Sequence, residues 1–469
     1  MRNRAQTAAQ YVGRVHRTLS TPLLLFSSLS LFFINTFFCF GQFADSLSVK
    51  SAERTEPGSI ATPPLIGSII VIGNRQTKEE IILREMTLTV GDTVSEDAIE
   101  YCKNRIYSLG LFNKVDIRYL PMDTTTMFVT VDERWFIYPV PMFGIVDRDF
   151  SKWFYGLGVK HENLTGRNEK LFAGFVLGYN PWVTVDYSDP WILGDLQMFS
   201  STTLSYSHVE NKSNLSRAGG ENFHERHYGV AQTIGKRYDQ YRRTWFSTGF
   251  RYVEVSEKKN GRTASEDGID RYLFVGIGMS HDTRDLAEYP TSGILGRASV
   301  TRYGFGEGEL DYTSYNLDVR KYTLLPMNIS IAVRGFARLS VGSNVPNYQH
   351  NFYGFGDRLR GHFEEEVEGD HIFGSTAEVR IPIVQSWYVH MPQIPIPQFA
   401  TWRFGLYAAL FADAGRVWNR GEAFTWNNMP SSIGAGIHIL LPYSAVMRFE
   451  YAWNELGRGE FIFDLGASF

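Results

Sequence analysis

Most of this chain alternates apolar and polar residues with the period of two that a β-strand requires. The clearest example is the segment 461–469, in which Phe461, Phe463, Leu465 and Phe469 share one apolar face. The other face of this segment carries mostly small or polar residues. Such strands suit a sheet that faces hydrocarbon on one side and water on the other, so the pattern predicts a transmembrane β-barrel.

Segments of this kind recur from residue 136 onward and predict sixteen antiparallel strands. The predicted strands are 136–147, 152–162, 168–179, 180–188, 197–209, 224–237, 242–255, 270–282, 294–303, 309–323, 328–341, 372–384, 401–416, 432–441, 444–453 and 460–469. If the first strand runs outward, the long connections follow odd strands, as external loops do, and the short ones follow even strands. The Pro-rich connection 385–400 is an exception, because it is long but follows an even strand.

The sequence near residue 450 predicts which face of the sheet is exposed to water. Arg448 and Glu450 alternate there with Phe449 and Tyr451. Burying the two charged side chains in hydrocarbon would be costly, so we expect them to face a watery lumen and the aromatic side chains to face lipid.

Residues 64–134 follow another pattern and predict a small β-α-α-β-β domain. Strands are expected at 66–72, 115–119 and 127–132, and helices at 77–86 and from 93 to about 109. Thr77 and Thr93 each have a glutamate three residues later, the spacing of a capping box at the start of a helix. Cys102 lies on the apolar face of the second helix and is expected to be buried.

The N-terminal segment 1–41 predicts a secretory signal peptide. Four arginines precede an apolar stretch from residue 23 to 40, and small residues allow cleavage before Gln42. A retained anchor helix is the alternative. Residues 42–63 are expected to form a flexible leader. Cleavage changes the net charge from −4 to −8, which argues against a nucleic-acid partner. Cys102 is then the one cysteine left, so no internal disulfide is expected.

Several segments resemble proteins of the BamA/TamA superfamily of outer-membrane assembly and translocation proteins. In the small domain, "VIGNRQT", "LREMTLTVGD", "YSLGLFNKV" and "VTVDE" closely resemble a POTRA domain, with a generic α/β spacer as the alternative. In the predicted barrel, "ENLTGRNEKL", "DYSDPWILG", "HDTRDLAEYPTSG" and "SIGAGIHILLP" resemble the bacterial surface antigen domain. The resemblance implies a POTRA domain at 64–134 in the periplasm and an outer-membrane barrel at 135–469.

The longest predicted external loop contains Leu359-Arg360-Gly361-His362 after a Gly-rich lead-in. In the family that this chain resembles, an Arg-Gly-aromatic tip of this loop folds back into the lumen. The match covers the first three residues, whereas His362 departs from the expected aromatic residue. Val333-Arg-Gly-Phe336 matches the string better, but it lies within a predicted strand and is rejected.

The same resemblance implies a partner for Arg360 on the barrel wall. Phe411, Asp413 and Gly415 have the family's Phe-x-Asp-x-Gly spacing. A guanidinium presents a fork of donors that suits a carboxylate, so an Arg360–Asp413 pair would hold the loop inside. The alternative is that both charges are solvated.

The first and last predicted strands indicate a lateral seam. Pro139 and Pro141 are two residues apart, so both lack an N–H on the same strand edge. If that edge faces the last strand, with Phe461, Phe463, Leu465 and Phe469, closure of the barrel is weakened there. The alternative is that both prolines belong to the linker.

No catalytic motif is apparent, so we expect no enzyme activity, no cofactor and no metal. The acidic run 364–370 is interpreted as a solvated loop. The predicted function is assembly: insertion or translocation of client polypeptides by strand addition at the POTRA edge and opening of the seam. Expected partners are client outer-membrane or secreted polypeptides, the lipid bilayer and periplasmic accessory proteins. The alternatives are a two-partner secretion pore, disfavoured because a second POTRA and a plug helix are not apparent, and a passive channel or surface antigen.

Overall fold

The computed structural model describes residues 64–120, 125–146, 149–211, 213, 222–305, 310–354, 357–362 and 365–466. The predicted signal peptide, the predicted leader and Phe469 lie outside these described residues. Residues 62–469 form one compact unit. None of the helices in the described part of the chain is long and apolar enough to cross a membrane.

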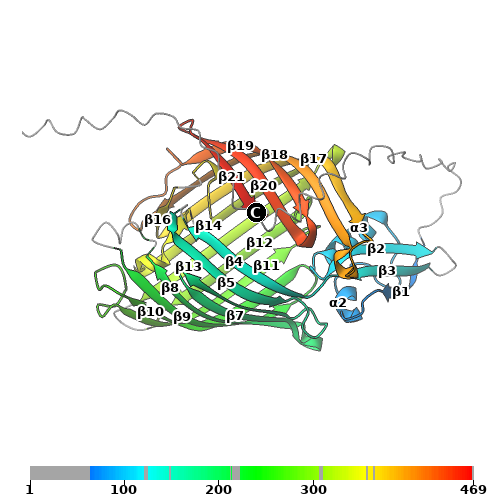
Figure 1. Ribbon diagram of the computed structural model, residues 1–469, viewed down its shortest axis with the longest axis horizontal. Coiled ribbons are helices and arrows are strands. Elements are labelled where there is room, and N and C mark those ends of the chain that lie inside the picture. Colours follow the sequence, from blue (N-terminus) through cyan, green and yellow to red (C-terminus); the bar gives the residue numbers. More distant parts are fainter. Residues whose placement is uncertain are drawn as a thin grey trace, which may run out of the picture. The chain divides into compact units, whose positions relative to one another are not determined.

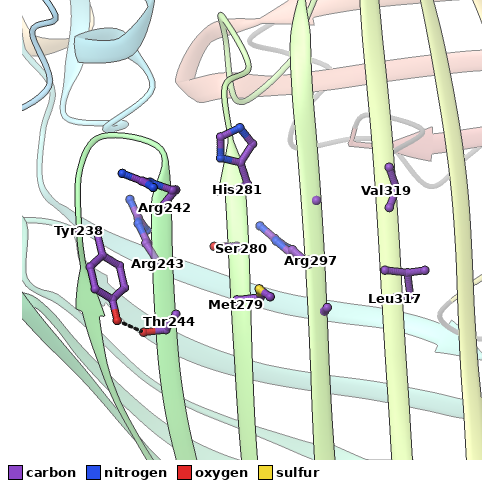
Figure 2. A pocket seen from close by; sticks show the side chains of 12 residues that line it. Tyr238, Arg242, Arg243, Thr244, Met279, Ser280, His281, Arg297, Leu317 and Val319 are labelled. Atoms are coloured by element: carbon purple, nitrogen blue, oxygen red, sulfur yellow. Dashed lines mark hydrogen bonds between the residues drawn. The ribbon is translucent and has the colours of Figure 1, made fainter.

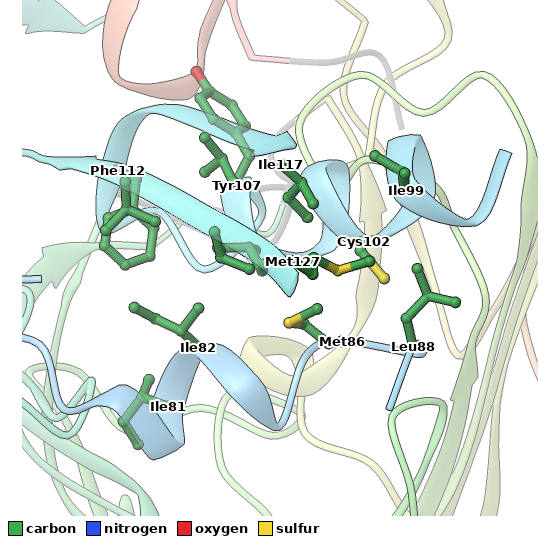
Figure 3. Close-up of a cluster of buried hydrophobic side chains, with 14 of the residues drawn as sticks. Ile81, Ile82, Met86, Leu88, Ile99, Cys102, Tyr107, Phe112, Ile117 and Met127 are labelled. Carbon is green, nitrogen blue, oxygen red and sulfur yellow. The ribbon is translucent and has the colours of Figure 1, made fainter. Parts of the chain in front are cut away.

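The N-terminal domain has the predicted β-α-α-β-β order. It consists of β1 (Ile66–Ile72), α2 (Glu79–Leu83), α3 (Glu96–Tyr107), β2 (Phe112–Leu120) and β3 (Thr125–Glu133). β3 is the central strand of the sheet, parallel to β1 and antiparallel to β2. The two helices pack on the sheet through side chains that include Ile82, Cys102 and Met127 (Figure 3). Cys102 is fully buried, as predicted.

Both predicted capping boxes are wrong. The N-cap residues are Lys78 and Ser95, and neither makes a side-chain cap hydrogen bond. Thr77 has other partners, because its N–H donates to Glu133 (2.7 Å) and its hydroxyl accepts from Asn163 (3.0 Å). Thr93 forms an antiparallel bridge with Leu65, so its backbone is extended three residues before the helix begins.

The remaining chain forms the predicted sixteen-stranded antiparallel sheet, in which sequence neighbours pair in order (Figure 1). Its strands are β4 (Ile137–Val146), β5 (Asp149–His161), β6 (Lys170–Gly178), β7 (Trp182–Leu193), β8 (Met198–Glu210), β9 (His224–Arg237), β10 (Arg242–Val255), β11 (Ile269–Asp282), β12 (Gly293–Tyr303), β13 (Asp311–Leu324), β14 (Ser330–Asn344), β17 (His371–His390), β18 (Thr401–Trp418), β19 (Ser431–Leu441), β20 (Ala445–Asn454) and β21 (Gly459–Leu465). A short hairpin, β15 (Asn351–Tyr353) and β16 (Val367–Gly369), lies between β14 and β17.

The two faces of this sheet differ as the alternation predicts. On β20, Phe449 and Tyr451 are exposed, whereas Arg448 and Glu450 are buried on the inner face. On β21, Phe461 and Phe463 are exposed. A continuous outer apolar face of this kind is what a transmembrane barrel presents to lipid.

The Pro-rich connection 385–400 is shorter than expected. β17 continues to His390 and pairs with β18 up to Thr401, so the connection covers 391–400 only. The ladder shifts register around Val384, next to Pro382, which has no N–H to donate. This irregularity interrupts the alternation, and the predicted strand therefore ended too early.

The N-terminal domain contacts only one class of connection among those described, the connections that follow even strands of the sheet. The connection residues that it meets through hydrogen bonds include Asn163, Gly166, Gln240, Ala287, Gln398 and Ser444. The long loop between β14 and β17 follows an odd strand. This agrees with the predicted topology, in which the N-terminal domain and the long loop lie at opposite ends of the barrel.

Candidate functional site

The tip of the long loop lies inside the sheet. A single turn, Arg360–His362, packs against β19, β20 and β21, and the Arg360 side chain is buried. Gly361 permits this approach, because a Cβ at this position would lie 2.5 Å from Ser432 Cβ. Leu359 is also buried, against Phe336 and other apolar residues of the loop base.

The Arg360 guanidinium meets three carboxylates. It donates to Asp413 through two parallel bonds, Nε to Oδ2 at 2.7 Å and Nη2 to Oδ1 at 2.8 Å. Nη1 also donates to Glu378 (2.7 Å) and Glu450 (2.9 Å). The ring of Phe411 lies beneath the guanidinium, 3.4 Å from Cζ to the ring centroid. Paired donors and a cation–π contact together fix the orientation of this side chain.

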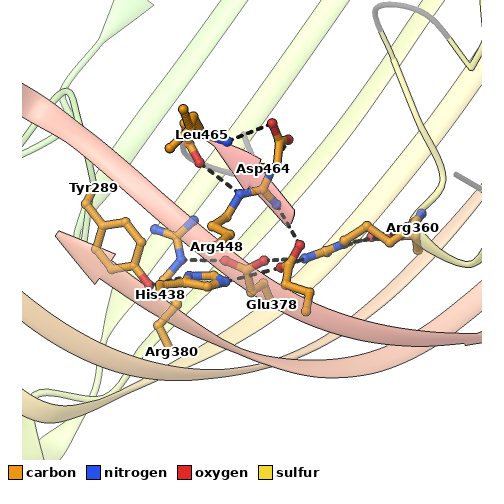
Figure 4. Close-up of polar contacts among 11 residues, drawn as sticks. Tyr289, Arg360, Glu378, Arg380, His438, Arg448, Asp464 and Leu465 are labelled. Carbon is orange, nitrogen blue, oxygen red and sulfur yellow. Dashed lines mark hydrogen bonds and ion pairs between the residues drawn. The ribbon is translucent and has the colours of Figure 1, made fainter. Parts of the chain in front are cut away.

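Two further arginines complete the charge balance (Figure 4). Arg380 donates to Glu378 at 2.7 Å, and Arg448 donates to Glu450 at 2.9 Å. Three buried guanidiniums therefore face the three carboxylates. Buried ions of this kind cost much of what they gain through desolvation, so the network specifies where the loop sits more than it adds to stability. We call these six residues, with His438, the lumen network.

Sequence reasoning paired Arg360 with Asp413 but missed Glu378, Arg380 and His438. Glu378 and Arg380 occupy alternate inward positions of β17, the same signal that indicated the inward orientation of Arg448 and Glu450. His438 Nε2 lies 3.2 Å from Glu450, because β19 and β20 are neighbours in the sheet. That neighbour relation follows from strand pairing rather than from any local motif.

Glu378, His438 and Glu450 also have the composition of a metal site, and their ligand atoms lie within 4.8 Å of one another. Their carboxylate oxygens are already engaged: Glu378 by Arg360 and Arg380, and Glu450 by Arg360 and Arg448. A divalent cation would have to displace these guanidiniums and would be repelled by them. The chemistry of the donor set therefore fits an ion-pair network and does not fit a metal centre.

Gly415 admits the loop hairpin. A Cβ here would lie 2.0 Å from the Tyr353 hydroxyl, which donates to the Phe373 carbonyl at 2.6 Å. The Gly of the Phe-x-Asp-x-Gly segment thus makes room for the loop, while its Phe and Asp contact Arg360.

His362 ties the loop tip to the connection between β20 and β21. Nδ1 lies 2.9 Å from Glu365, and Nε2 lies 2.9 Å from Glu455. Burial alone would lower the pKa of His362, but the hydrogen bonds to Glu455 and Glu365 outweigh it and raise the pKa above its usual value. Because a histidine stands where an aromatic residue was expected, the loop tip has a contact whose charge depends on pH.

The sheet ends at β4 and β21. Among the described residues no ladder joins these two strands. Pro139 and Pro141 lie within β4, opposite Val159 and Leu157 of β5, and not in a linker.

The phase of the β4–β5 ladder shows which edge the prolines affect. The N–H of Glu162 donates to the Phe136 carbonyl at 2.9 Å, so even-numbered residues of this strand form the hydrogen-bonded pairs with β5. Pro139 and Pro141 occupy the alternate positions, whose N–H groups would point away from β5. The edge of β4 on the side away from β5 therefore lacks two donors.

A hollow of about 510 Å³ lies on the sheet between β10 and β13 (Figure 2). Ala298 lies between the bulkier Met279 and Leu317, which belong to the outer apolar face, and Gly296 lies between His281 and Val319. The hollow is thus part of the surface expected to meet lipid, and none of its lining residues belongs to the lumen network.

Comparisons with known proteins agree with this architecture. Residues 163–469 match the Omp85 superfamily domain, and residues 64–134 match the surface antigen variable number repeat, a POTRA family. The outer membrane protein assembly factor BamA of Nitratidesulfovibrio vulgaris is 22% identical over 432 residues, which cover 86% of this chain and 51% of that protein. The chain thus spans about half the length of this relative.

A solved BamA structure has the same fold. BamA from Haemophilus ducreyi lacking POTRA domains 1–3 superimposes with a TM-score of 0.51 at 16% identity, covering 86% of this chain and 84% of that one. CdiB from Acinetobacter baumannii gives a TM-score of 0.47 at 13% identity, covering 86% and 73%. With its sixteen-stranded sheet, POTRA domain and match over residues 163–469, this chain is a bacterial outer-membrane protein that belongs to the Omp85 superfamily.

Proposed function

We propose that this protein inserts client polypeptides into the outer membrane, or passes them across it, through a seam between β4 and β21. The observation that supports the proposal is the edge of β4 away from β5, where Pro139 and Pro141 remove two donors that a pairing with β21 would need. A barrel seam with missing hydrogen bonds costs less to open than any other strand pair of the sheet. An opened seam offers a client strand two backbone edges to pair with.

The POTRA domain, located in the periplasm, is proposed to receive clients by strand addition. Its sheet has the edges β1 and β2. The start of β1 is covered, because Ile66 exchanges backbone hydrogen bonds with residues 91 and 92. Within the described residues, no backbone hydrogen bond from outside the sheet reaches β2, which makes β2 the better edge for a client.

The lumen network supports the same function through the last strand. Arg448, which is paired with Glu450, also donates to Asp464 (2.6 Å) and to the Gly466 carbonyl (2.8 Å). Arg360 of the loop contacts Glu450 as well. The position of the loop is therefore connected to one side of the proposed seam.

Reconstitution tests this proposal. The full protein would be placed in liposomes, and urea-unfolded client barrels would be added while folding is followed by heat-modifiable gel mobility. The expected result is faster client folding than in protein-free liposomes of the same composition. Steady pore conductance without any effect on client folding would contradict the proposal and favour a passive channel.

A further inference from the structure

We propose that the connection between β11 and β12, residues 283–292, is a positioning element that joins the POTRA domain to the lumen network. This connection enters the core of the POTRA domain at one end and the lumen network at the other. Through it, a displacement of the POTRA domain changes how firmly Arg360 and the last strand are held.

The first contact is with the POTRA domain. Leu286 is buried as a member of the same apolar cluster as Ile106, Leu111 and other POTRA core residues. The N–H of Ala287 donates to the hydroxyl of Ser108, directly after α3, at 3.0 Å. The connection is therefore packed into the POTRA core and not merely adjacent to it.

The second contact is with the lumen network. Tyr289 is 1% exposed, and its hydroxyl lies 2.8 Å from His438 Nδ1. Nε2 of the same ring lies 3.2 Å from a carboxylate oxygen of Glu450, so His438 bridges Tyr289 and Glu450. Arg380 lies over the Tyr289 ring at 4.3 Å and donates to the Pro290 carbonyl at 3.0 Å.

His438 and Arg380 connect in turn to the loop tip and to β21. His438 and Arg360 share one oxygen of Glu450, and Arg380 and Arg360 take the two oxygens of Glu378. The other oxygen of Glu450 accepts from Arg448, which holds β21. Tyr289 and Pro290 therefore position the carboxylates that receive the loop tip.

The connection is built to move as one body. Asp285 accepts from the N–H groups of Thr291 (2.9 Å) and Ser292 (3.1 Å) and from the Thr291 hydroxyl (2.6 Å). At the start of the connection, the Arg284 guanidinium donates two hydrogen bonds to the carboxylate of Asp282. A closed, internally bonded turn transmits a displacement of Leu286 to Tyr289, because packed elements of this kind do not deform continuously.

Hydrogen exchange on the full protein in detergent tests this coupling without any client. Ser108→Ala and Tyr289→Phe each remove one hydrogen bond, one on each side of the connection. Loss of one such bond corresponds to about three- to tenfold faster exchange in the segments it holds. We expect this faster exchange in peptides covering 357–362 and 459–466 for both single variants. In the double variant, the fold-increase in exchange rate should be smaller than the product of the two single-variant increases.

Two controls separate coupling from general loosening. Gln240→Ala removes a POTRA contact at a neighbouring connection, the bond to the Met86 carbonyl, that does not reach the lumen network. Tyr179→Phe removes a hydroxyl–carboxylate bond to Glu210 at another part of the sheet. Neither should accelerate exchange at 357–362 or 459–466.

A disulfide provides the opposite perturbation. Cysteines at Ser108 and Ala287 would lock the POTRA domain to the connection, and we expect slower exchange at the loop tip when the bond forms and recovery on reduction. Acceleration confined to 283–292 in the single variants, with no effect of the disulfide beyond it, would overturn the inference. Because no client is present, that result would leave the proposed insertion activity untouched.

Discussion

At the scale of single residues, Arg360 is the side chain on which the site depends. It is a cation on a loop, yet it is buried among Asp413, Glu378 and Glu450, which lie on three different strands. Lysine could not replace it, because an ammonium group cannot make the two parallel bonds to Asp413 and still reach the other two carboxylates.

Arg360→Ala and Asp413→Ala should not act independently. Each substitution removes the same paired bond, and residues in one network show coupling energies of up to about 3 kcal/mol. We expect coupling of about 2 kcal/mol in the free energy of unfolding, measured by urea titration in detergent for both single variants and the double variant. Arg416→Ala is the control, because the hydrogen bonds of Arg416 to described residues go to backbone carbonyls and a hydroxyl of an exposed loop. Strictly additive effects would contradict the pairing.

His362 should make the seating of the loop depend on pH. Its pKa is raised in the folded protein by Glu455 and Glu365, so its contribution is present below about pH 6.5 and is lost as pH rises through the raised pKa. A polarity-sensitive, pH-insensitive dye at Val367→Cys should report an alkaline transition that His362→Gln abolishes. Identical profiles with and without His362→Gln would show that His362 does not hold the loop.

The site was partly predictable at this scale. The motif spacings indicated Arg360 and Asp413, and strand alternation indicated the inward orientation of Arg448 and Glu450. Tyr289 was not predictable, because it lies in a connection that the alternation pattern does not describe, and its partner His438 is 149 residues away.

At the scale of elements, the period-two pattern located the strands, and the confirmed fold class rests on it. The errors have local causes. Thr77 does not cap its helix, because it forms hydrogen bonds with Glu133 and Asn163. A register shift in β17 interrupts the alternation, so the last residues of this strand were not predicted. Hydrogen bonds from distant segments decide such details, and no local pattern contains them.

The POTRA domain should depend on Glu85. This buried carboxylate pairs with Arg105 (2.9 Å) of α3 and Arg237 (2.6 Å) of β9. Burial raises the pKa of Glu85, but the hydrogen bond and charge of Arg237, with Arg105, outweigh it and lower the pKa, so the contribution is lost as pH falls through the lowered value.

Glu85→Gln leaves these arginines buried without a counter-charge and should destabilise the junction by about 3–5 kcal/mol. Cleavage of the POTRA domain by a protease at neutral pH should therefore accelerate, whereas the exposed control Glu80→Gln should behave like the wild type. Equal cleavage of both variants would mean that the Glu85 cluster does not hold the domain.

At the scale of the whole molecule, the POTRA contacts and the position of the long loop agree with the same topology of the sheet. Every described POTRA contact with a connection falls after an even strand, and the loop that supplies Arg360 enters from the other end. The lumen network lies between them and reaches β21. In the proposed function, the loop, the last strand and the missing donors of β4 all act at the seam.

The most direct test restores the missing donors. Pro139→Val and Pro141→Val together would let β4 donate two more hydrogen bonds toward β21, and valine suits the exposed outer face. Hydrogen exchange would first show whether the new amides are protected, with Pro382→Val as a control far from the seam. Two bonds correspond to about 2 kcal/mol, so we predict client insertion in liposomes that is slower by about 5- to 30-fold. Undiminished insertion by a protein whose new amides are protected would contradict the account.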